Sequence, residues 1–324
     1  MIAEFLLSMA SPAAAGGRLS ILIFHRVLAR PDPLFPEIPD AAAFDALMSH
    51  VRRRFNVVRL ADGVARLADG TLPARALAVT FDDGYADNRS IAAPILRRHG
   101  VPATVFVATA FLDGGCMWND RVIEACRLTV LADLDLDAWG LGRHSMPDIR
   151  ARREIIDRLL QRLKYEPLDR RESISRAIAE AAGVAVPSDL MLSCNELRDL
   201  PGNGIDIGAH TRAHPILAES SDADAWEEID GGRRDLARIL GTPPALFAYP
   251  NGAPETDYGT RHVRMVREAG FAAAVSTAPG AATATSDRFQ VPRFTPWRRA
   301  PTAFDAMMWR NLRQGDERRC ATEA

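Results

Sequence analysis

The sequence is short of lysine: Lys164 is the only lysine among 40 basic residues. We interpret this shortage as a compositional bias. Acidic residues number 42, so the formal net charge is −2 and the pI is near 6.4. This balance provides no strongly basic surface of the kind that binds nucleic acid or an acidic membrane. We therefore expect neither of these as a partner.

Cysteine and long apolar runs are also scarce. The chain has four cysteines: Cys116, Cys126, Cys194 and Cys320. Their spacing matches neither a metal site nor a disulfide framework, so we expect free thiols, as in a reducing compartment. No run approaches about 18 apolar residues, the length that predicts a membrane-spanning helix. The segment around Phe5–Leu7 lacks the basic flank of a signal peptide, and we predict a leading helix and a cytoplasmic protein, with a periplasmic or extracellular location as the alternative.

Length and hydrophobic pattern favour one catalytic domain over residues 1–324. A chain of this length with 47% hydrophobic residues can bury a large core. Strand-like runs lie near 20–25, 56–60, 75–81, 102–108, 205–210, 245–250, 271–276 and 289–293. Helical patterns, including Phe44 to Arg54 and Asn88 to Arg98, alternate with them. This alternation predicts an α/β fold with a parallel sheet, closed towards a barrel whose site lies at the C-terminal strand ends.

Residues 113–190 interrupt this alternation. Apolar residues recur there at helical spacing: Ile155, Ile156, Leu159, Leu160 and Leu163. The pattern predicts two or three amphipathic helices inserted between strands, serving either as a cover that selects the substrate or as plain decoration. The chain turns polar after Arg310, and residues 311–324 are predicted to form a frayed tail.

Two adjacent carboxylates follow one predicted strand. The apolar run 76–81 ends abruptly at Asp82-Asp83-Gly84, which is a turn signal. Consecutive strand residues point to opposite faces, so both aspartates reach one site only if the chain turns, which Gly84 permits. A bound cation would relieve their repulsion by taking one carboxylate as a ligand and leaving the other as a proton acceptor. The simpler alternative is that both aspartates cap a helix starting near Asp87.

Two histidines four residues apart follow another strand-like segment, 205–209. The spacing places His210 and His214 on one side of a helical turn, but Pro215 disfavours helical geometry, so we expect a single turn or a loop. Two imidazoles with one carboxylate suit zinc and related metals and leave positions open for water and substrate. A structural role for the histidines is the alternative. Together with the aspartate pair, they favour a metal-dependent hydrolase.

At these motifs the chain resembles the polysaccharide deacetylases of carbohydrate esterase family 4, in the branch with a Tyr-Pro-x-Gly motif. The first motif of that family is similar to Thr80–Tyr85, and its His-Ser/Thr-x-x-His motif is similar to His210–His214. Looser similarity extends to Ile21–Arg26, Phe247–Gly252 and Val291–Arg293. The resemblance spans about residues 20 to 300 and implies the incomplete (β/α) barrel of that family, with 113–190 as an insertion.

The resemblance also implies roles for individual residues. It makes Asp82 the catalytic base, and it makes Asp83, His210 and His214 the ligands of one divalent metal ion. Zinc is the expected metal, with cobalt, nickel and iron as alternatives. The resemblance further implies that the backbone N–H of Tyr249 stabilises an oxyanion. Asn251, in the same motif, is predicted to contact the substrate or the oxyanion.

The chain departs from the commoner family pattern at two positions. The third motif lacks its arginine, and we predict that Arg293 pairs with the catalytic aspartate instead, unless it is a surface residue. No histidine follows His262, so the late Leu-x-His motif that supplies the general acid is missing. We predict that His25 takes that part, the alternative being a core histidine at a strand end. Trp297 is predicted to stack on a sugar ring.

The sequence therefore predicts a hydrolase that removes N-acetyl or O-acetyl groups from an acetylated glycan. The glycan is an amino-sugar polysaccharide such as an exopolysaccharide, an oligosaccharide or a lipid-linked precursor. The alternatives are a glycan-binding relative without turnover, an amide hydrolase with a non-sugar substrate, and an iron-dependent oxygenase with the same ligand set. The oxygenase would require an all-β scaffold, which the alternating pattern does not support.

Overall fold

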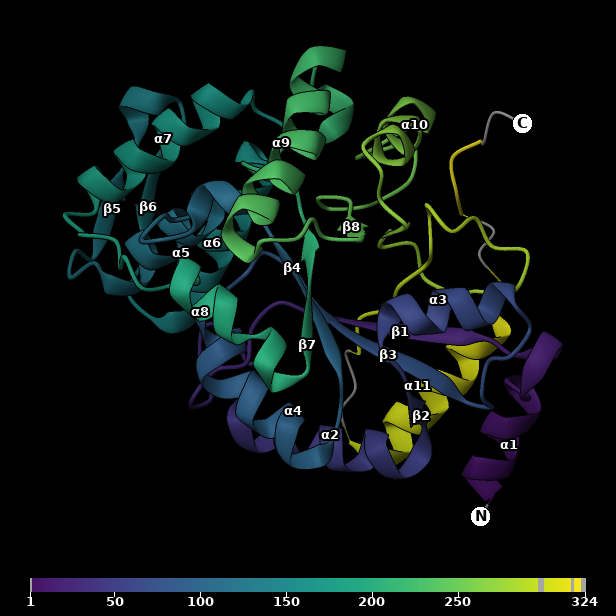
Figure 1. Cartoon of the computed structure of the whole chain (residues 1–324). Helices are drawn as coiled ribbons and strands as arrows, with labels where there is room; N and C mark the ends of the chain where they lie inside the picture. Colours follow the sequence, from purple (N-terminus) through teal and green to yellow (C-terminus); the bar gives the residue numbers. More distant parts are fainter. Residues whose placement is uncertain (1, 297–299, 316–317, 322–324) are drawn as a thin grey trace.

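A parallel sheet curled into an incomplete barrel forms the centre of the protein (Figure 1). The computed structural model describes residues 2–296, 300–315 and 318–321. The strands follow the order β1-β3-β4-β7-β8-β9, and β2 pairs with β3 beside this path. Their bounds are β1 Leu19–Phe24, β2 Asn56–Val57, β3 Ala76–Phe81, β4 Ala103–Val107, β7 Ile205–Ala209, β8 Leu246–Ala248 and β9 Ala273–Val275. The predicted fold class is confirmed.

The central strands are buried along their whole length. All six residues of β1 and all six of β3 are buried, as expected for parallel strands covered on both faces. The two strands end level, because Phe24 pairs with Phe81. The register therefore places His25 beside Asp82 at the same edge of the sheet, and the Asp82 backbone N–H donates to the Phe24 carbonyl at 2.9 Å.

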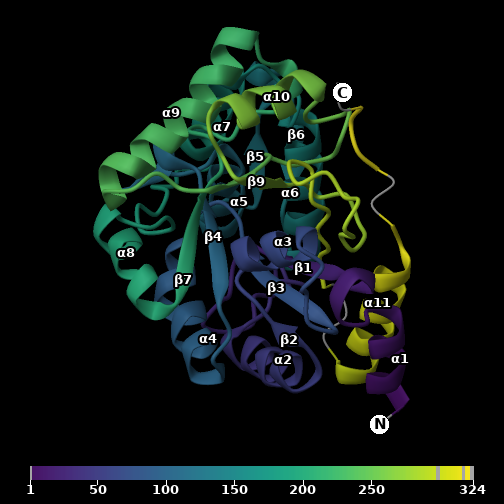
Figure 2. The ribbon, with the colours of Figure 1, turned by 45° about the vertical axis from the view of Figure 1, so that its right-hand side comes forward.

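Helices follow the strands and cover the sheet. They are α1 Ile2–Ala10, α2 Ala41–Arg54, α3 Leu60–Ala68, α4 Ala93–His99, α8 Cys194–Asp199, α9 Asp222–Leu240, α10 Thr260–Glu268 and α11 Pro301–Arg313. The predicted helix 44–54 is present and begins earlier, because the Asp40 carboxylate accepts the Ala43 N–H at 2.7 Å and caps it. The predicted helix 88–98 is present as a π-helical turn, Asn88–Ala92, followed by α4. The leading helix α1 lies beside α11 (Figures 1 and 2).

The insertion forms a separate group of helices at the opposite end of the molecule from α1 and α11 (Figures 1 and 2). It contains α5 Trp118–Leu128, α6 Ile149–Leu163 and α7 Leu168–Ala181, as the helical spacing predicted. Ile156, Leu159 and Leu163 are buried in a core of its own. The antiparallel hairpin of β5 Asp133–Asp135 and β6 Arg143–Ser145 was not predicted, because three-residue strands carry too little periodicity to be recognised.

The segment 289–293 was wrongly predicted to be a strand. It makes only isolated bridges: Val291 pairs with Val275, and the following Phe294 pairs with Leu22. Its backbone therefore lies between β9 and β1, with Val291 N–H donating to Ala274 and Phe294 N–H donating to Ile21, both at 2.9 Å. This segment spans the gap between the first and last strands of the barrel.

The polar C-terminal segment is ordered further than the predicted tail of 311–324 implies. α11 continues to Arg313, and Cys320 is buried, its backbone N–H donating to Gln290 Oε1 at 2.8 Å. All four cysteines are free thiols. Among the described residues, no helix is long and apolar enough to cross a membrane.

The close packing of β7 against β4 generates a stability prediction. A Cβ at Gly208 would lie 2.3 Å from Cδ1 and 2.4 Å from Cε1 of the buried Phe106 ring. We expect Gly208→Ala to lower the free energy of unfolding by about 1–3 kcal/mol in urea denaturation, because the ring must shift. Gly202→Ala is the control, since nothing lies within 4 Å of its Cβ position. Equal effects of the two substitutions would contradict this view of the interface.

Candidate active site

The aspartate pair leaves β3 through a left-handed turn. Asp83 has φ 76° and Gly84 has φ 87°, a region that aspartate enters more readily than most non-glycine residues. A Cβ at Gly84 would also lie 3.1 Å from Val107 Cγ1. The turn directs the two carboxylates to different partners, and neither caps a helix: the π-helical turn after Asp87 has no side-chain cap.

Asp82 is held by Arg293 in a buried, two-pronged ion pair. Arg293 Nη1 and Nη2 each donate to one Asp82 carboxylate oxygen at 2.7 Å. The arginine is fully buried, and it also donates to the Ser276 carbonyl at 3.0 Å and the Thr80 hydroxyl at 3.1 Å. Burial alone would raise the pKa of Asp82, but the charge of Arg293, the charge of His210 and the hydrogen bonds from Arg293 together outweigh burial and lower it. The surface alternative for Arg293 is therefore excluded.

Asp83 faces the two histidines instead. Its Oδ1 lies 3.5 Å from Nε2 of His210 and 3.5 Å from Nε2 of His214. This buried oxygen has no hydrogen-bond partner among the described residues. His210 Nδ1 lies 2.7 Å from the Ala248 carbonyl, so Nδ1 carries an N–H and Nε2 is the ring nitrogen that faces Asp83.

These three side chains fit a metal ion. One ligand atom from each lies within 4.8 Å of the others, and an aspartate with two imidazoles leaves further coordination positions open. Burial lowers the pKa of His214 to about 4, so its imidazole is neutral at pH 7. For His210, burial is outweighed by the Asp83 and Asp82 carboxylates, which raise its pKa. A bound cation would replace that proton as the partner of Asp83.

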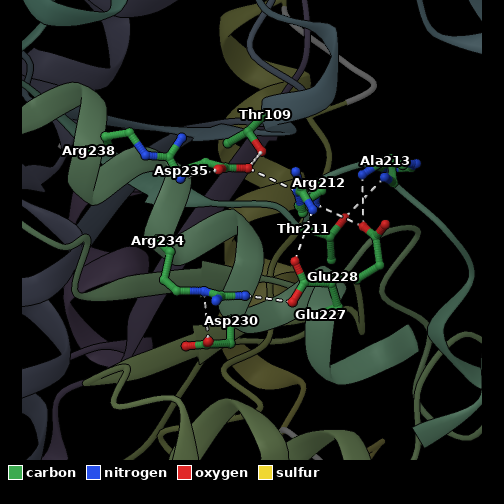
Figure 3. A network of polar contacts seen from close by, with 11 residues as sticks. Thr109, Thr211, Arg212, Ala213, Glu227, Glu228, Asp230, Arg234, Asp235 and Arg238 are labelled. Atoms are coloured by element: carbon green, nitrogen blue, oxygen red, sulfur yellow. Dashed lines mark hydrogen bonds and ion pairs between the residues drawn. The ribbon is translucent and has the colours of Figure 1, made fainter. Parts of the chain in front are cut away.

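The histidines lie on a loop that α9 holds in place. Thr211 has φ 64° and His214 has φ 53°, so the segment is a loop rather than a helical turn. Figure 3 shows Glu228 accepting the backbone N–H groups of Arg212 and Ala213, at 2.9 and 2.8 Å. Sequence reasoning missed this support, although the acidic residues of α9 recur on one face.

A cavity of about 950 Å³ opens over this site. The barrel contributes Asp82, Asp83, His210, His214, His25 and Asn251 to its lining. The His25 side chain is exposed at the cavity, so it is not a core histidine. The insertion supplies the facing wall, including Trp118, Asp120, Lys164 and Arg171, none of which was predicted as a site residue.

Asp120 is the most perturbed group on that wall. It is buried, and the Tyr85 hydroxyl donates to its Oδ1 at 3.1 Å. Burial raises the pKa of Asp120 to about 7. Its spacing with Glu124 and Arg127 on α5 follows one helical face and was the available sequence signal.

Tyr249 does not occupy the oxyanion position predicted for it. Its backbone N–H donates to the Val275 carbonyl at 3.2 Å, and its hydroxyl donates to the Phe289 carbonyl at 3.0 Å. Both donors are therefore engaged within the protein. Asn251 lines the cavity with φ 57°, and its backbone N–H makes no hydrogen bond to a described residue. Trp297 lies outside the described residues.

The Asp82–Arg293 pair generates a second prediction. We expect Arg293→Met to lower the free energy of unfolding at pH 7 by about 3–5 kcal/mol, because it leaves a buried carboxylate unpaired. The folded-state pKa of Asp82 is lowered, so the contribution of the pair is present above the ordinary aspartate pKa and is lost as pH falls through the lowered value. The deficit of Arg293→Met should therefore shrink in acid. The double variant Asp82→Asn/Arg293→Met should lose less unfolding free energy than Arg293→Met. An equal loss in the two variants would contradict a charge-based explanation.

The sequence profile of the polysaccharide deacetylase family matches residues 69–135 and 175–274, just over half of the chain. The unmatched residues between these ranges fall inside the insertion. No curated protein matches the chain.

Several solved structures have a similar fold. The Streptococcus pyogenes deacetylase PplD, in complex with acetate, has a TM-score of 0.60 and 16% identity over 90% of this chain and 98% of its own. A de-N-acetylase from Aggregatibacter actinomycetemcomitans has a TM-score of 0.55 and 15% identity, covering 86% and 94% of the two chains. IcaB from Ammonifex degensii has a TM-score of 0.57 and 17% identity, covering 94% and 99%. With the profile match, these findings show that the chain belongs to the polysaccharide deacetylase family and is a carbohydrate deacetylase.

Proposed function

We propose that this protein removes N-acetyl groups from an amino-sugar glycan in a metal-dependent hydrolysis. The observation that carries the proposal is the unequal environment of two adjacent carboxylates: Arg293 holds Asp82, whereas Asp83 faces two imidazoles with an unpaired oxygen. The similarity to a deacetylase and a de-N-acetylase supports the N-acetyl chemistry.

Asp83, His210 and His214 would hold the ion. Such an ion, when bound, acidifies a water molecule and polarises the carbonyl of the acetamide. Asp82 accepts the proton of the attacking water, and the charge of Arg293 keeps its carboxylate ionised and oriented. The backbone N–H of Asn251 is placed to donate to the oxyanion that forms at the carbonyl. His25 donates a proton to the departing amine, leaving acetate and the free amino sugar as products.

The arrangement argues against a binding protein without turnover. That alternative depended on the missing third-motif arginine and the missing late histidine. A buried arginine from a later segment now pairs with Asp82, and an early histidine lines the same cavity. The site therefore has both a guanidinium beside the aspartate and an imidazole at the cavity, although neither comes from the usual motif.

Two substitutions should separate metal binding from proton transfer. We expect the purified protein to bind one zinc-like ion and Asp83→Ala to lose it, together with acetate release from N-acetylglucosamine oligomers. Asp82→Asn should keep the metal but lower kcat by about 10²–10⁴-fold, because only the base is removed. Metal content by mass spectrometry and acetate release measure the two effects. Asp62→Asn, on the exposed face of α3, is the control; normal metal content in Asp83→Ala would refute the ligand assignment.

The acid role of His25 has a separate test. We expect His25→Gln to lower kcat by about 10²-fold or more while metal content stays unchanged, since glutamine cannot supply the proton. His99→Gln is the matched control, because His99 pairs with Asp45 and does not line the cavity. A variant His25→Gln with normal kcat would remove His25 from the mechanism.

A further inference from the structure

Arg171 is a buried cation without an acidic partner on the cavity wall. Its side chain belongs to a residue that is 3% exposed, and it lines the same cavity as Asp83 and His214. Nη1 donates to the Lys164 carbonyl at 3.2 Å, but Nε and Nη2 donate to no described residue. The guanidinium lies 4.9 Å from the centroid of the Trp118 ring, which fixes its position.

The nearby carboxylates are engaged by other arginines. Glu172, the neighbour of Arg171 in sequence, pairs with Arg121 at 2.8 Å and Arg176 at 3.7 Å. Glu166 pairs with Arg162 at 2.9 Å. Burial lowers the pKa of Arg171, yet a guanidinium stays protonated in proteins. A largely buried positive charge therefore faces the cavity without an ion pair of its own, which is costly unless a ligand supplies an anion.

The acidic side chains Asp32, Glu124 and Asp120, which line the cavity, do not pair with Arg171 either. Asp32 and Glu124 both pair with Arg127, at 2.7 and 3.0 Å. Asp120 accepts the Tyr85 hydroxyl, and the burial that raises its pKa disfavours its charged form. None of these carboxylates makes an ion pair with Arg171.

Lys164 adds a second positive charge to the lining of the same cavity. The only lysine of the chain lines the cavity, and its ammonium makes no ion pair with a described residue. Its carbonyl accepts the hydrogen bond from Arg171, so the two residues are direct neighbours. Both residues line the same cavity as the catalytic groups.

We propose that Arg171 and Lys164 form a cationic subsite that binds an anionic group, a phosphate or a carboxylate, of the acetylated amino-sugar substrate. The planar guanidinium offers paired N–H donors that match either oxyanion. This inference rests on the proposed function, because it assigns a substrate class to the same site. The insertion is then the part of the chain that selects the substrate.

The anion can come from three sources that share this chemistry. A carboxylate is present in N-acetylmuramic acid oligomers, and a phosphate in N-acetylglucosamine 1-phosphate or in a polyprenyl-phosphate-linked sugar. The cavity is also lined by the apolar side chains of Phe35, Ile123 and Leu160, which provide a surface for the hydrocarbon chain of a polyprenyl phosphate. Comparing kcat/KM for these substrates with that for a neutral N-acetylglucosamine tetramer identifies the source.

The test compares Arg171→Met with Arg170→Met in the metal-loaded enzyme. Arg170 is the neighbouring residue on α7, is exposed, pairs with Glu166 and does not line the cavity. We expect Arg171→Met to lower kcat/KM for the preferred anionic substrate by about 10- to 100-fold, far more than for the neutral tetramer. Arg170→Met should leave both unchanged, and Arg171→Lys should recover part of the loss. Equal losses on anionic and neutral substrates would overturn the proposal.

Stability measurements keep the test independent of turnover. Inorganic phosphate should raise the Tm of the wild-type protein and of Arg170→Met, but not that of Arg171→Met. Without phosphate, Arg171→Met should be at least as stable as the wild type, because an uncompensated buried charge is removed. If no substrate releases acetate, the proposed function fails while the phosphate shift still decides the subsite. If acetate is released but phosphate shifts all proteins equally, the subsite alone is refuted.

Discussion

The buried ion pair between Arg293 and Asp82 is the constraint on which the site depends. It joins the end of β3 to the segment that lies between β9 and β1, so the same contact spans the gap in the barrel and orients a carboxylate. A buried pair is stable only when its remaining hydrogen-bonding groups are satisfied. Here the Ser276 carbonyl and the Thr80 hydroxyl complete the partners of the guanidinium. The same ion pair therefore closes the gap in the barrel and orients the catalytic carboxylate.

With Asp82 engaged, the next carboxylate is free for a different task. Asp83 is turned away by its left-handed backbone, and its unpaired oxygen faces two imidazoles. Those imidazoles lie on a loop whose backbone N–H groups are bound by Glu228 of α9 (Figure 3). The positions of the two candidate ligand histidines are therefore supported by contacts outside the site itself, as metal centres generally need. The barrel thereby supplies a common hydrolytic centre.

The insertion supplies the cavity wall that faces this centre. Its three helices pack on a core of their own and place Trp118, Asp120, Lys164 and Arg171 opposite the aspartates. The helices were predictable because Ile156, Leu159 and Leu163 recur at helical spacing. The charged residues on the cavity wall were not predictable, since several exposed arginines of this chain likewise lie four residues from an acidic residue and pair with it. Only packing distinguishes Arg171 from those surface arginines.

The sequence by itself determined the strand and helix alternation, the fold class and the local motifs, because each depends on residues close together in the chain. It placed Asp82 and Asp83 at one strand end and the two histidines at another. Tertiary structure decided which arginine reaches Asp82, as Arg293 is 211 residues away. It also decided that the Tyr249 N–H donates to the Val275 carbonyl and is not available to the substrate. Burial and the absence of a partner are properties of the packed molecule, because they depend on side chains brought together from distant segments.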